Sequence, residues 1–572
     1  MQTAQINRGL HKKSSCALHR ELFFEHYYNV KESSANIVLI VSYLLIVQSI
    51  ICYKNQKHFN QFTMSLLFCV ILFYIIFLVS AAASVGTEQM STGHLVVFAS
   101  LRSVQSGHPP DVLHPCNKIP WRNMRMSKDE YLINDAPLKA LTVFAMPMIL
   151  GSFFQQIYNM ADSIIVGQFV GSSALAAVGA CAALTNVFIC VALGAGVGAG
   201  VLVSRYFGAK EYGKMKTIVS TSLLSFLILS IVLGIFGLCF TRPMMRCLQT
   251  PPDILDEAVL YLRVYFVGFP FLFMYNILST MFTSIGESRI PLALLIFSSV
   301  LNIIMDLWMV AGLGLGVFGA ALATLIAQGI SAVFSLLIFI HRMRRYESPF
   351  QRFDWRGLQS MLQIAVPSIL QQSTVSIGML IVQAVVNPFG TQALAGYSAT
   401  MRVENVFSLI FVSIGNAVSP FVSQNLGAGK PQRIKKGYQA ALVLDLCFAV
   451  IAFVTIEALH TQISSLFLGK DGTALAYQVS GDYMRWIGYF FIFMGIKMAT
   501  DGVLRGLGIM RPFLVANMVN LAVRLSVALI CAPRFGIAFV WLAVPVGWLA
   551  NFLISYGALR RLWRTDKMTS TR

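Results

Sequence analysis

Three polar side chains fall on one face of an otherwise apolar segment. Residues 146 to 171 are long enough to cross a bilayer, yet they include Gln155, Tyr158 and Asp162. Residues three and four apart share a helix face, so these three should lie together, above a break imposed by Pro147. A carboxylate in lipid costs about 3 kcal/mol, and more when it stays charged without partners. We therefore expect Asp162 to have a function and not only to make a polar contact between helices.

A second polar group lies further along the chain. Asn302 and Asp306 are four residues apart and share a helix face. Thr324 follows in the next apolar segment, after the short turn formed by residues 311 to 316. A short link makes the two helices antiparallel neighbours, and similar distances from the turn give Asn302 and Thr324 similar depths in the bilayer.

These two groups together predict a cation site. Asp162, Asp306, Asn302 and Thr324 offer oxygen atoms, which suit a hard cation such as sodium, and two acids can instead share a proton. Both carboxylates cannot stay charged in a low dielectric without a cation. One of them must therefore be protonated or bind sodium, and the sequence does not choose between the two ions.

The composition indicates a polytopic membrane protein. The 572 residues are 56% hydrophobic and 12% charged, with a mean hydropathy of +0.70. Repeated apolar runs of about 20 residues predict helices, because lipid offers the backbone no hydrogen-bond partner outside a helix or a closed barrel. We predict an all-α fold of twelve transmembrane helices in two six-helix lobes. The spans are predicted near residues 138 to 166, 174 to 205, 218 to 240, 257 to 284, 291 to 311, 315 to 340, 358 to 386, 394 to 425, 437 to 459, 475 to 504, 512 to 531 and 536 to 559.

The positive charge of the chain predicts its orientation. The formal net charge is +19, but the Lys and Arg residues sit in short clusters between apolar spans, so we expect no nucleic-acid partner. The links after the even-numbered spans and the chain end are rich in these residues, whereas the opposite links are poorer. The positive-inside bias then places both ends of the twelve-helix unit in the cytoplasm, in a multi-pass protein of the cell inner membrane.

The sequence offers no enzyme site and no cofactor site. Ten cysteines are scattered without the paired spacing of metal ligands, and the nine histidines lie mostly outside the spans. We predict that the chain is not an enzyme and uses no cofactor beyond its coupling ion.

The first 125 residues differ from the rest of the chain. They hold two apolar runs, at about residues 37 to 53 and 62 to 85, which are either two extra helices or a consequence of a misassigned start. We favour a start at Met126, because a short polar lead-in to the first helix follows it. The predicted organisation is an extension over residues 1–125, an N lobe over 126–340, a cytoplasmic linker over 341–357, a C lobe over 358–560 and a basic tail over 561–572.

An internal repeat relates the two lobes at a separation of about 220 residues. The matched positions keep their order along the chain. They include Pro147 with Pro367, Gly208 with Gly427, Tyr261 with Tyr483, Gly286 with Gly508, Arg289 with Arg511, Asn302 with Asn520 and Gly316 with Gly536. An even number of spans separates the copies, so both have the same orientation and should flank a cleft. The two prolines are then expected to mark a repeated helix start.

The repeat makes the acidic site asymmetric. Asp306 aligns with Arg524, and Asp162 aligns near Ile381 or Val382, so the acids occur in the first lobe only. A purely architectural residue would often be symmetric, and the asymmetry therefore favours a function for the acids.

Other polar and small residues have structural interpretations. The glycines at alternate positions from 194 to 200 lack the strand and Lys of a nucleotide loop, so we expect close helix packing there. Ion pairs within a lobe are expected for Asp445, Glu457 and Lys497. Arg402 and Glu404 are expected either to pair or to face the cleft.

At these residues the chain resembles the multidrug and toxic compound extrusion (MATE) family, on the side of its bacterial drug-efflux members. The resemblance is carried by the segments FFQQIYNMADSIIVGQFVG, YLRVYFVGFPFLFMYNILSTMFTSIGESRIP, NIIMD followed by GVFGAALAT, and VSQNLGAGK, and it covers about residues 126 to 565. It implies an exporter of cationic, aromatic compounds driven by sodium or proton entry. It also implies an N-lobe cation and substrate site formed by Gln155, Tyr158, Asp162, Asn276, Asn302, Asp306 and Thr324.

The resulting hypothesis is antiport by alternating access of the two lobes. The expected partners are small cationic or aromatic molecules and the lipid bilayer, and the sequence is compatible with a monomer. A flippase for lipid-linked oligosaccharides, from the same superfamily, is the alternative. It would need a cleft rich in Arg and Lys for pyrophosphate, and Arg402 is among the few candidates.

Overall fold

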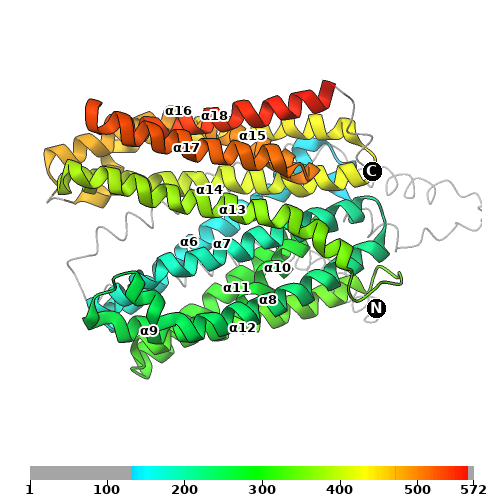
Figure 1. The fold of residues 1–572 in the computed structure, drawn as a ribbon, viewed down its shortest axis with the longest axis horizontal. Helices are drawn as coiled ribbons and strands as arrows, with labels where there is room; N and C mark the ends of the chain where they lie inside the picture. Colours follow the sequence, from blue (N-terminus) through cyan, green and yellow to red (C-terminus); the bar gives the residue numbers. More distant parts are fainter. Residues whose placement is uncertain (1–129, 470–471, 565–572) are drawn as a thin grey trace, which may run out of the picture. The chain divides into compact units, whose positions relative to one another are not determined.

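The computed structural model describes residues 130–469 and 472–564. These residues form helices joined by short links (Figure 1). The first lobe comprises α5 (Tyr131–Asn134), α6 (Pro137–Phe169), α7 (Ser172–Gly208), α8 (Tyr212–Cys247), α9 (Pro252–Val267), α10 (Phe269–Ser284), α11 (Arg289–Asp306), the π-helix η1 (Leu307–Gly312) and α12 (Gly316–Met343). The second comprises α13 (Trp355–Val386), the short 3-10 helix η2 (Asn387–Phe389), α14 (Thr391–Gly427), α15 (Pro431–Leu468), α16 (Ala474–Leu507), α17 (Met510–Phe535) and α18 (Ala538–Arg564).

The predicted fold class is confirmed. Over the described ranges, eleven helices are long and apolar enough to cross a membrane, and the bent pair α9 and α10 supplies a twelfth span. The predictions for residues 1–125 and for the last eight residues of the tail lie outside the described residues.

The fourth span departs from the continuous helix that we predicted over residues 257 to 284. It bends by 53° between α9 and α10. Gly268 stands at the break and Pro270 follows at the second position of α10. Proline has no N–H to donate and clashes with the preceding turn of a helix, so α10 starts anew there.

The prediction for Pro147 was wrong. It was expected to start and break the first helix, but it lies ten residues inside the continuous helix α6, and Pro367 similarly lies inside α13. In a long membrane helix, neighbouring helices can support the backbone groups that an internal proline leaves free.

The first helix of each lobe also packs on the other lobe. α6 contacts α11 of its own lobe and both α14 and α15 of the second lobe. α13 likewise contacts α17 of its own lobe and α7 of the first lobe. In Figure 1 the two groups of helices form two layers, with α6 and α7 next to α13 and α14. The two halves of the sequence repeat therefore also make equivalent helix contacts, both within a lobe and between lobes.

Glycines allow this close packing, as the sequence predicts. A Cβ atom built at Gly194 would lie 2.6 Å from the backbone of Ile369, and one at Gly198 would lie 2.5 Å from the carbonyl oxygen of Met361. On the other side of α7, Gly196 and Gly200 face Thr280 of α10. One helix thus uses two glycine pairs, four residues apart, to approach both lobes.

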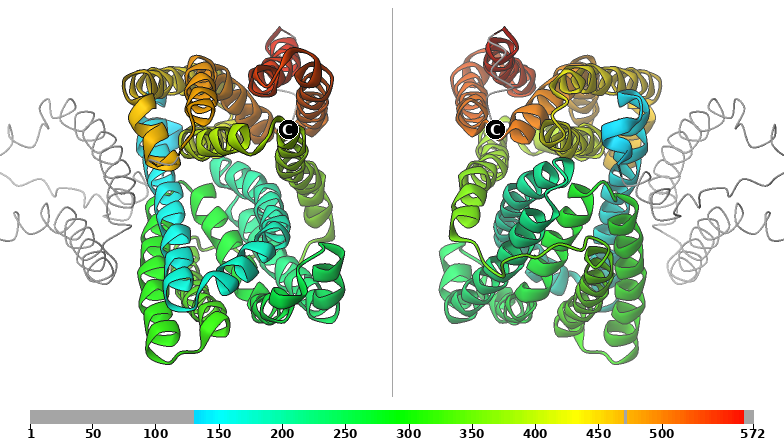
Figure 2. Two further views of the ribbon diagram at one scale, coloured as in Figure 1. Left: turned by 90° about the vertical axis from the view of Figure 1, so that its left-hand side faces the viewer. Right: turned by 90° about the vertical axis from the view of Figure 1, so that its right-hand side faces the viewer.

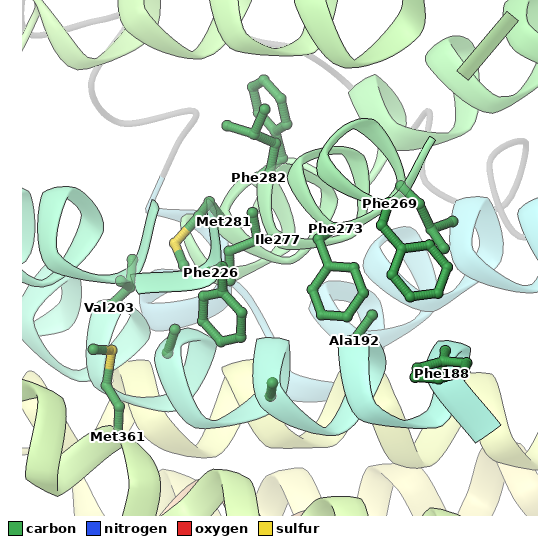
Figure 3. Close-up of a cluster of buried hydrophobic side chains, with 14 of the residues drawn as sticks. Phe188, Ala192, Val203, Phe226, Phe269, Phe273, Ile277, Met281, Phe282 and Met361 are labelled. Carbon is green, nitrogen blue, oxygen red and sulfur yellow. The ribbon is translucent and has the colours of Figure 1, made fainter. Parts of the chain in front are cut away.

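Aromatic side chains fill the core of the first lobe. Phe188 of α7 meets the rings of Phe266 and Phe269 edge to face, with centroids 5.4 and 5.0 Å away. Figure 3 shows Phe226, Phe269 and Phe273 pointing toward the same region. This packing fixes α10 against α7 and α8.

The positively charged links all join helix ends on one side of the protein, the basic face. This face comprises α5, the end of α18 and the links α7–α8, α10–α11, α12–α13, α14–α15 and α16–α17. The link α12–α13 is held along α8, because the backbone N–H groups of Gln351 and Asp354 donate to the hydroxyls of Thr217 and Thr221.

The two lobes meet reciprocally at the basic face. Gln424 of α14 donates to the carbonyl oxygen of Ser284 at 2.8 Å, and Arg205 of α7 donates to that of Leu507 at 2.9 Å. A Cβ atom at Gly208 would overlap Gln424, and one at Gly427 would overlap Arg205. Gly208 and Gly427 are partners in the sequence repeat, so related residues make related contacts across the interface.

Candidate functional site

Helices α6 and α11 bring the two acids of the first lobe together. The carboxyl groups of Asp162 and Asp306 lie within hydrogen-bonding distance of each other. Asp306 is fully buried, and Asp162 is partly buried. In each carboxyl group the Oδ1 atom is buried and has no hydrogen-bond partner. The pair therefore has acceptor oxygens in excess of the donors around it.

An amide and a hydroxyl complete one side of this pair. Asn302 lies one turn before Asp306, and its amide is 3.2 Å from the hydroxyl of Thr324 in α12. The amide orientation that satisfies its neighbours directs Nδ2 to Oδ2 of Asp306 at 2.8 Å and the amide oxygen to Thr324. The short turn between α11 and α12 allows this contact, as the sequence predicts.

Two tyrosines flank the acids. The hydroxyl of Tyr158, one turn before Asp162, approaches that of Thr324. Tyr261 of α9 lies near both Asp162 and Tyr158 and stacks on Tyr265, with ring centroids 6.4 Å apart. Sequence reasoning did not include Tyr261 in the site, although the repeat had singled out this position.

Gln155 and Asn276 bond elsewhere. The amide of Gln155 donates to Asn159 of the same helix at 3.3 Å. The amide of Asn276 donates to the backbone carbonyl of Leu272, also within its own helix, at 2.8 Å. The structure thus brings together five of the seven predicted residues: Tyr158, Asp162, Asn302, Asp306 and Thr324.

The backbone changes its winding directly after Asp306. α11 ends at this residue, and η1 continues as a π-helix of six residues. Short π-helical stretches occur often at functional sites, where they displace a side chain from its regular position. No periodicity in the sequence had indicated this change.

The corresponding region of the second lobe is built differently. Val382, one of the positions aligned with Asp162, is fully buried and apolar. Arg524 takes the place of Asp306 and lies near Glu404, which accepts a hydrogen bond from Tyr483. Tyr483 stacks between Tyr397 and Trp541, so the space around the Glu404 carboxyl is filled by rings. Arg402, in contrast, is exposed.

Two of the three predicted ion pairs within a lobe are confirmed. Lys497 pairs with Asp501 at 2.9 Å, and both side chains are less than 5% exposed. Glu457 pairs with Arg485 at 2.6 Å at the protein surface. The prediction for Asp445 was wrong, because both of its carboxyl oxygens are buried without a hydrogen-bond partner. The side chain packs against Gly495 of α16, where an apolar contact surface offers no cation.

The donor set does not match a transition-metal site. Within the described ranges, no group of three or more His, Cys, Asp or Glu side chains is arranged to hold a metal ion. Two carboxylates with an amide and a hydroxyl instead offer only hard oxygen donors.

Comparison with known proteins identifies the family. The family model MatE matches residues 147–308 and 367–530, which together make up more than half of the chain and correspond to the two lobes. A probable multidrug resistance protein, YpnP of Bacillus subtilis, is 27% identical over 67% of this chain and 85% of its own length. The multidrug export protein MepA of Staphylococcus haemolyticus is 27% identical over 67% and 86%. An FAD transporter of Shewanella oneidensis is 24% identical over 77% and 99%.

Solved structures agree with the fold. An outward-facing multidrug resistance MATE transporter of the MOP superfamily superimposes with a TM-score of 0.71 at 22% identity, covering 78% of this chain and 99% of the other. A MOP superfamily transporter from Pyrococcus furiosus also gives a TM-score of 0.71 and 22% identity, covering 78% of this chain and 98% of the other. The family suggested by the sequence is confirmed: the chain is a multi-pass membrane transporter and belongs to the multidrug and toxic compound extrusion (MatE) family.

Proposed function

We propose that this transporter exports organic cations by antiport, with entry of sodium ions or protons at Asp162 and Asp306 as the driving reaction. The observation that carries the proposal is the pair of buried Oδ1 atoms without donors. Two adjacent carboxylates whose charge is not fully compensated by donors repel each other in a low dielectric unless a cation or a proton lies between them. A coupling ion would supply this missing positive charge.

The arrangement of helices supports the way in which the ion would act. α6 carries Asp162 and also packs on α14 and α15 of the second lobe, whereas Asp306 belongs to α11 of the first lobe. Binding an ion between these residues would stabilise one arrangement of the lobes over the other. Coupling requires only that the ion has different affinities for the two arrangements.

Cationic aromatic substrates fit the surroundings of the acids. Asp162 and Asp306 attract positive charge, and the tyrosine rings of Tyr158 and Tyr261 provide faces for cation–π contacts. The multidrug proteins among the relatives support this substrate class. Substrate and coupling ion would then compete for the same negative charge, and this competition would produce the exchange.

Charge also supports an orientation. The links at the basic face contain most of the Lys and Arg residues of the twelve-helix unit, and the positive-inside bias assigns such links to the cytoplasm. We place the protein in the cell inner membrane with the basic face in the cytoplasm. Substrate release would occur at the opposite face.

Transport in proteoliposomes tests the proposal. The purified full-length chain is reconstituted, and the movement of ethidium is recorded with a sodium gradient alone and with a pH gradient alone. We expect one of the two gradients to drive efflux in the wild type and in Asp256→Asn, which removes an exposed carboxylate. Failure of both gradients would contradict antiport. Export of FAD without any export of ethidium would contradict the assigned substrate class and leave the coupling site intact.

A further inference from the structure

A short segment at the basic face is bound to both lobes. Residues 130 to 135, which contain α5, precede the first membrane helix, and Leu132 and Ile133 are buried. On the side of the second lobe, Asn425 donates to the carbonyl oxygen of Leu132 at 3.0 Å. In the same lobe, Arg433 donates to the carbonyl oxygen of Asp135, and Lys430 donates to that of Ile133. These bonds use backbone acceptors and a buried amide.

Two other contacts bind the same segment to the first lobe. The hydroxyl of Tyr131 donates to the carbonyl oxygen of Gly286, in the link α10–α11, at 2.9 Å. Lys210, in the link α7–α8, pairs with the carboxylate of Glu130 at 3.1 Å. The hydrogen bond to Glu130 raises the pKa of Lys210 above its ordinary value, so the lysine stays charged at neutral pH. Residues 130 to 135 therefore bridge the lobes.

The backbone conformation at Lys210 indicates that a lysine side chain is required at this turn. Lys210 has a φ angle of +60°, in the left-handed region that favours glycine. The repeat places Gly429, with a φ angle of +67°, at the matching turn of the second lobe. A residue with a Cβ atom is strained in this region, and glycine would remove the strain. The first lobe instead has a lysine whose amine reaches Glu130.

We propose that residues 130 to 135 act as a latch that holds the basic face closed, and that the contacts of Glu130 with Lys210 and of Tyr131 with Gly286 break when this face opens. This proposal rests on the alternating access assumed in the proposed function. The latch favours the arrangement in which the lobes are in contact at the basic face.

The contacts indicate from which lobe residues 130 to 135 separate when the basic face opens. The segment packs on α14, and Asn425, Lys430 and Arg433 of the second lobe all donate hydrogen bonds to it, so the segment moves with the second lobe. Figure 2 shows this cyan segment against the second lobe in both views. The contacts with the first lobe are fewer, and the side chain of Lys210 is 62% exposed. An exposed ion pair is weak and reversible, as repeated opening requires.

Two crosslinks, made in full-length protein whose native cysteines are replaced by serine, separate the two sides of the latch. Glu130→Cys with Lys210→Cys joins the segment to the first lobe, and Asn134→Cys with Lys430→Cys joins it to the second. A reducible bis-methanethiosulfonate reagent closes each pair. We expect the first crosslink to slow ethidium transport at least about tenfold, with recovery after reduction, and the second to leave transport unchanged. Equal transport with both crosslinks, or inhibition by both, would overturn the proposal.

A measurement without substrate separates this proposal from the proposed function. Spin labels at Lys214→Cys and Lys436→Cys, one in each lobe at the basic face, report the distance between the lobes. Glu130→Gln combined with Tyr131→Phe should increase the share of the longer distance, whereas Lys139→Ala, an exposed neighbour, should not. An unchanged distance distribution in the double variant would overturn the latch, even if ethidium transport is normal. If the labelled protein shows the expected shift but moves no ethidium with either gradient, the proposed function fails and the latch is supported.

Discussion

The two lobes treat buried charge in different ways. In the second lobe, Lys497 neutralises Asp501, and the amide of Asn517 and the hydroxyl of Ser555 donate to the same carboxylate. In the first lobe, Asp162 and Asp306 lie beside each other, and each keeps a buried oxygen without a donor. The same helical arrangement thus contains one compensated carboxylate and one uncompensated pair.

This difference separates a structural role from a functional one. A buried carboxylate that is paired with a lysine and accepts two further hydrogen bonds has its charge compensated within the protein and needs no external ion. A pair in which each carboxyl keeps a buried oxygen without a donor would be stabilised by a cation or proton from outside, so its stability would change when that ion binds or leaves. Under the proposed antiport, the coupling ion would therefore act on the first lobe.

Removing an acid of the pair should have the largest effect on transport. Asp162→Asn or Asp306→Asn places an amide where the coupling charge is needed, and we expect gradient-driven efflux to fall at least about 100-fold. Protein in the membrane should remain at the wild-type amount. Efflux in proteoliposomes and immunoblotting of membranes measure the two quantities. Undiminished efflux in both variants would show that the first lobe is not the ion-coupled one.

Breaking the compensated cluster should instead reduce stability. Lys497→Met removes the direct ion-pair partner of the buried Asp501, and breaking a buried pair typically costs about 3–5 kcal/mol of folding free energy. Thermal unfolding in detergent measures the loss. Arg485→Met removes the exposed pair with Glu457 and is the matched control, with an expected cost of about 0–1 kcal/mol. Equal losses in the two variants would contradict a buried structural role for Lys497.

Substitution of the reciprocal glycines tests whether both lobes contribute equally to the closed basic face. A methyl group at Gly208 or Gly427 overlaps the backbone of the opposite lobe, and such overpacking costs about 1–3 kcal/mol. Gly208→Ala and Gly427→Ala should therefore favour separation of the lobes to a similar degree, measured by the spin-label distance between positions 214 and 436. Gly557→Ala, where no atom lies within 4 Å, should have no effect. A strong effect of only one glycine variant would show that the interface is not reciprocal.

Substitution of Asp445 should affect transport less than substitution of the other buried acids. Both of its oxygens lack hydrogen-bond partners, but no other carboxyl group in the described ranges interacts with it. A single acid can remain neutral with its own proton, so Asp445→Asn changes little and transport should stay within about twofold of wild type. A loss comparable to that of Asp306→Asn would extend ion coupling to the second lobe, and the two lobes would then not differ in this respect.

The sequence predicted much of the fold and a large part of the site. Apolar length alone indicated twelve spans, because lipid forces the backbone into helices. The spacing of Asn302 and Asp306 and the short turn before Thr324 predicted their contact, since both are local properties of helices. Gln155 and Asn276 have residue types suited to the predicted site, but their amides form hydrogen bonds within their own helices.

Other features depended on contacts between distant segments. Tyr261 of α9 lies near Asp162 of α6, and the π-helix after Asp306 has no sequence period of its own. Pro147 shows the reverse case, since a residue that breaks isolated helices remains inside α6. In each case the packing of neighbouring helices overrides or adds to the local preference of the chain.

The sequence by itself determined the class of the protein, the two-lobe repeat and the restriction of the acidic pair to the first lobe. Hydropathy, the spacing of the repeat and residue identity can all be read directly from the order of the residues. Only the tertiary structure decided which polar groups meet. It placed Asp162 beside Asp306 without sufficient donors, gave Lys497 a partner, left Asp445 without one, and bound residues 130 to 135 to both lobes. These outcomes depend on the distances between side chains on different helices, which no local pattern specifies.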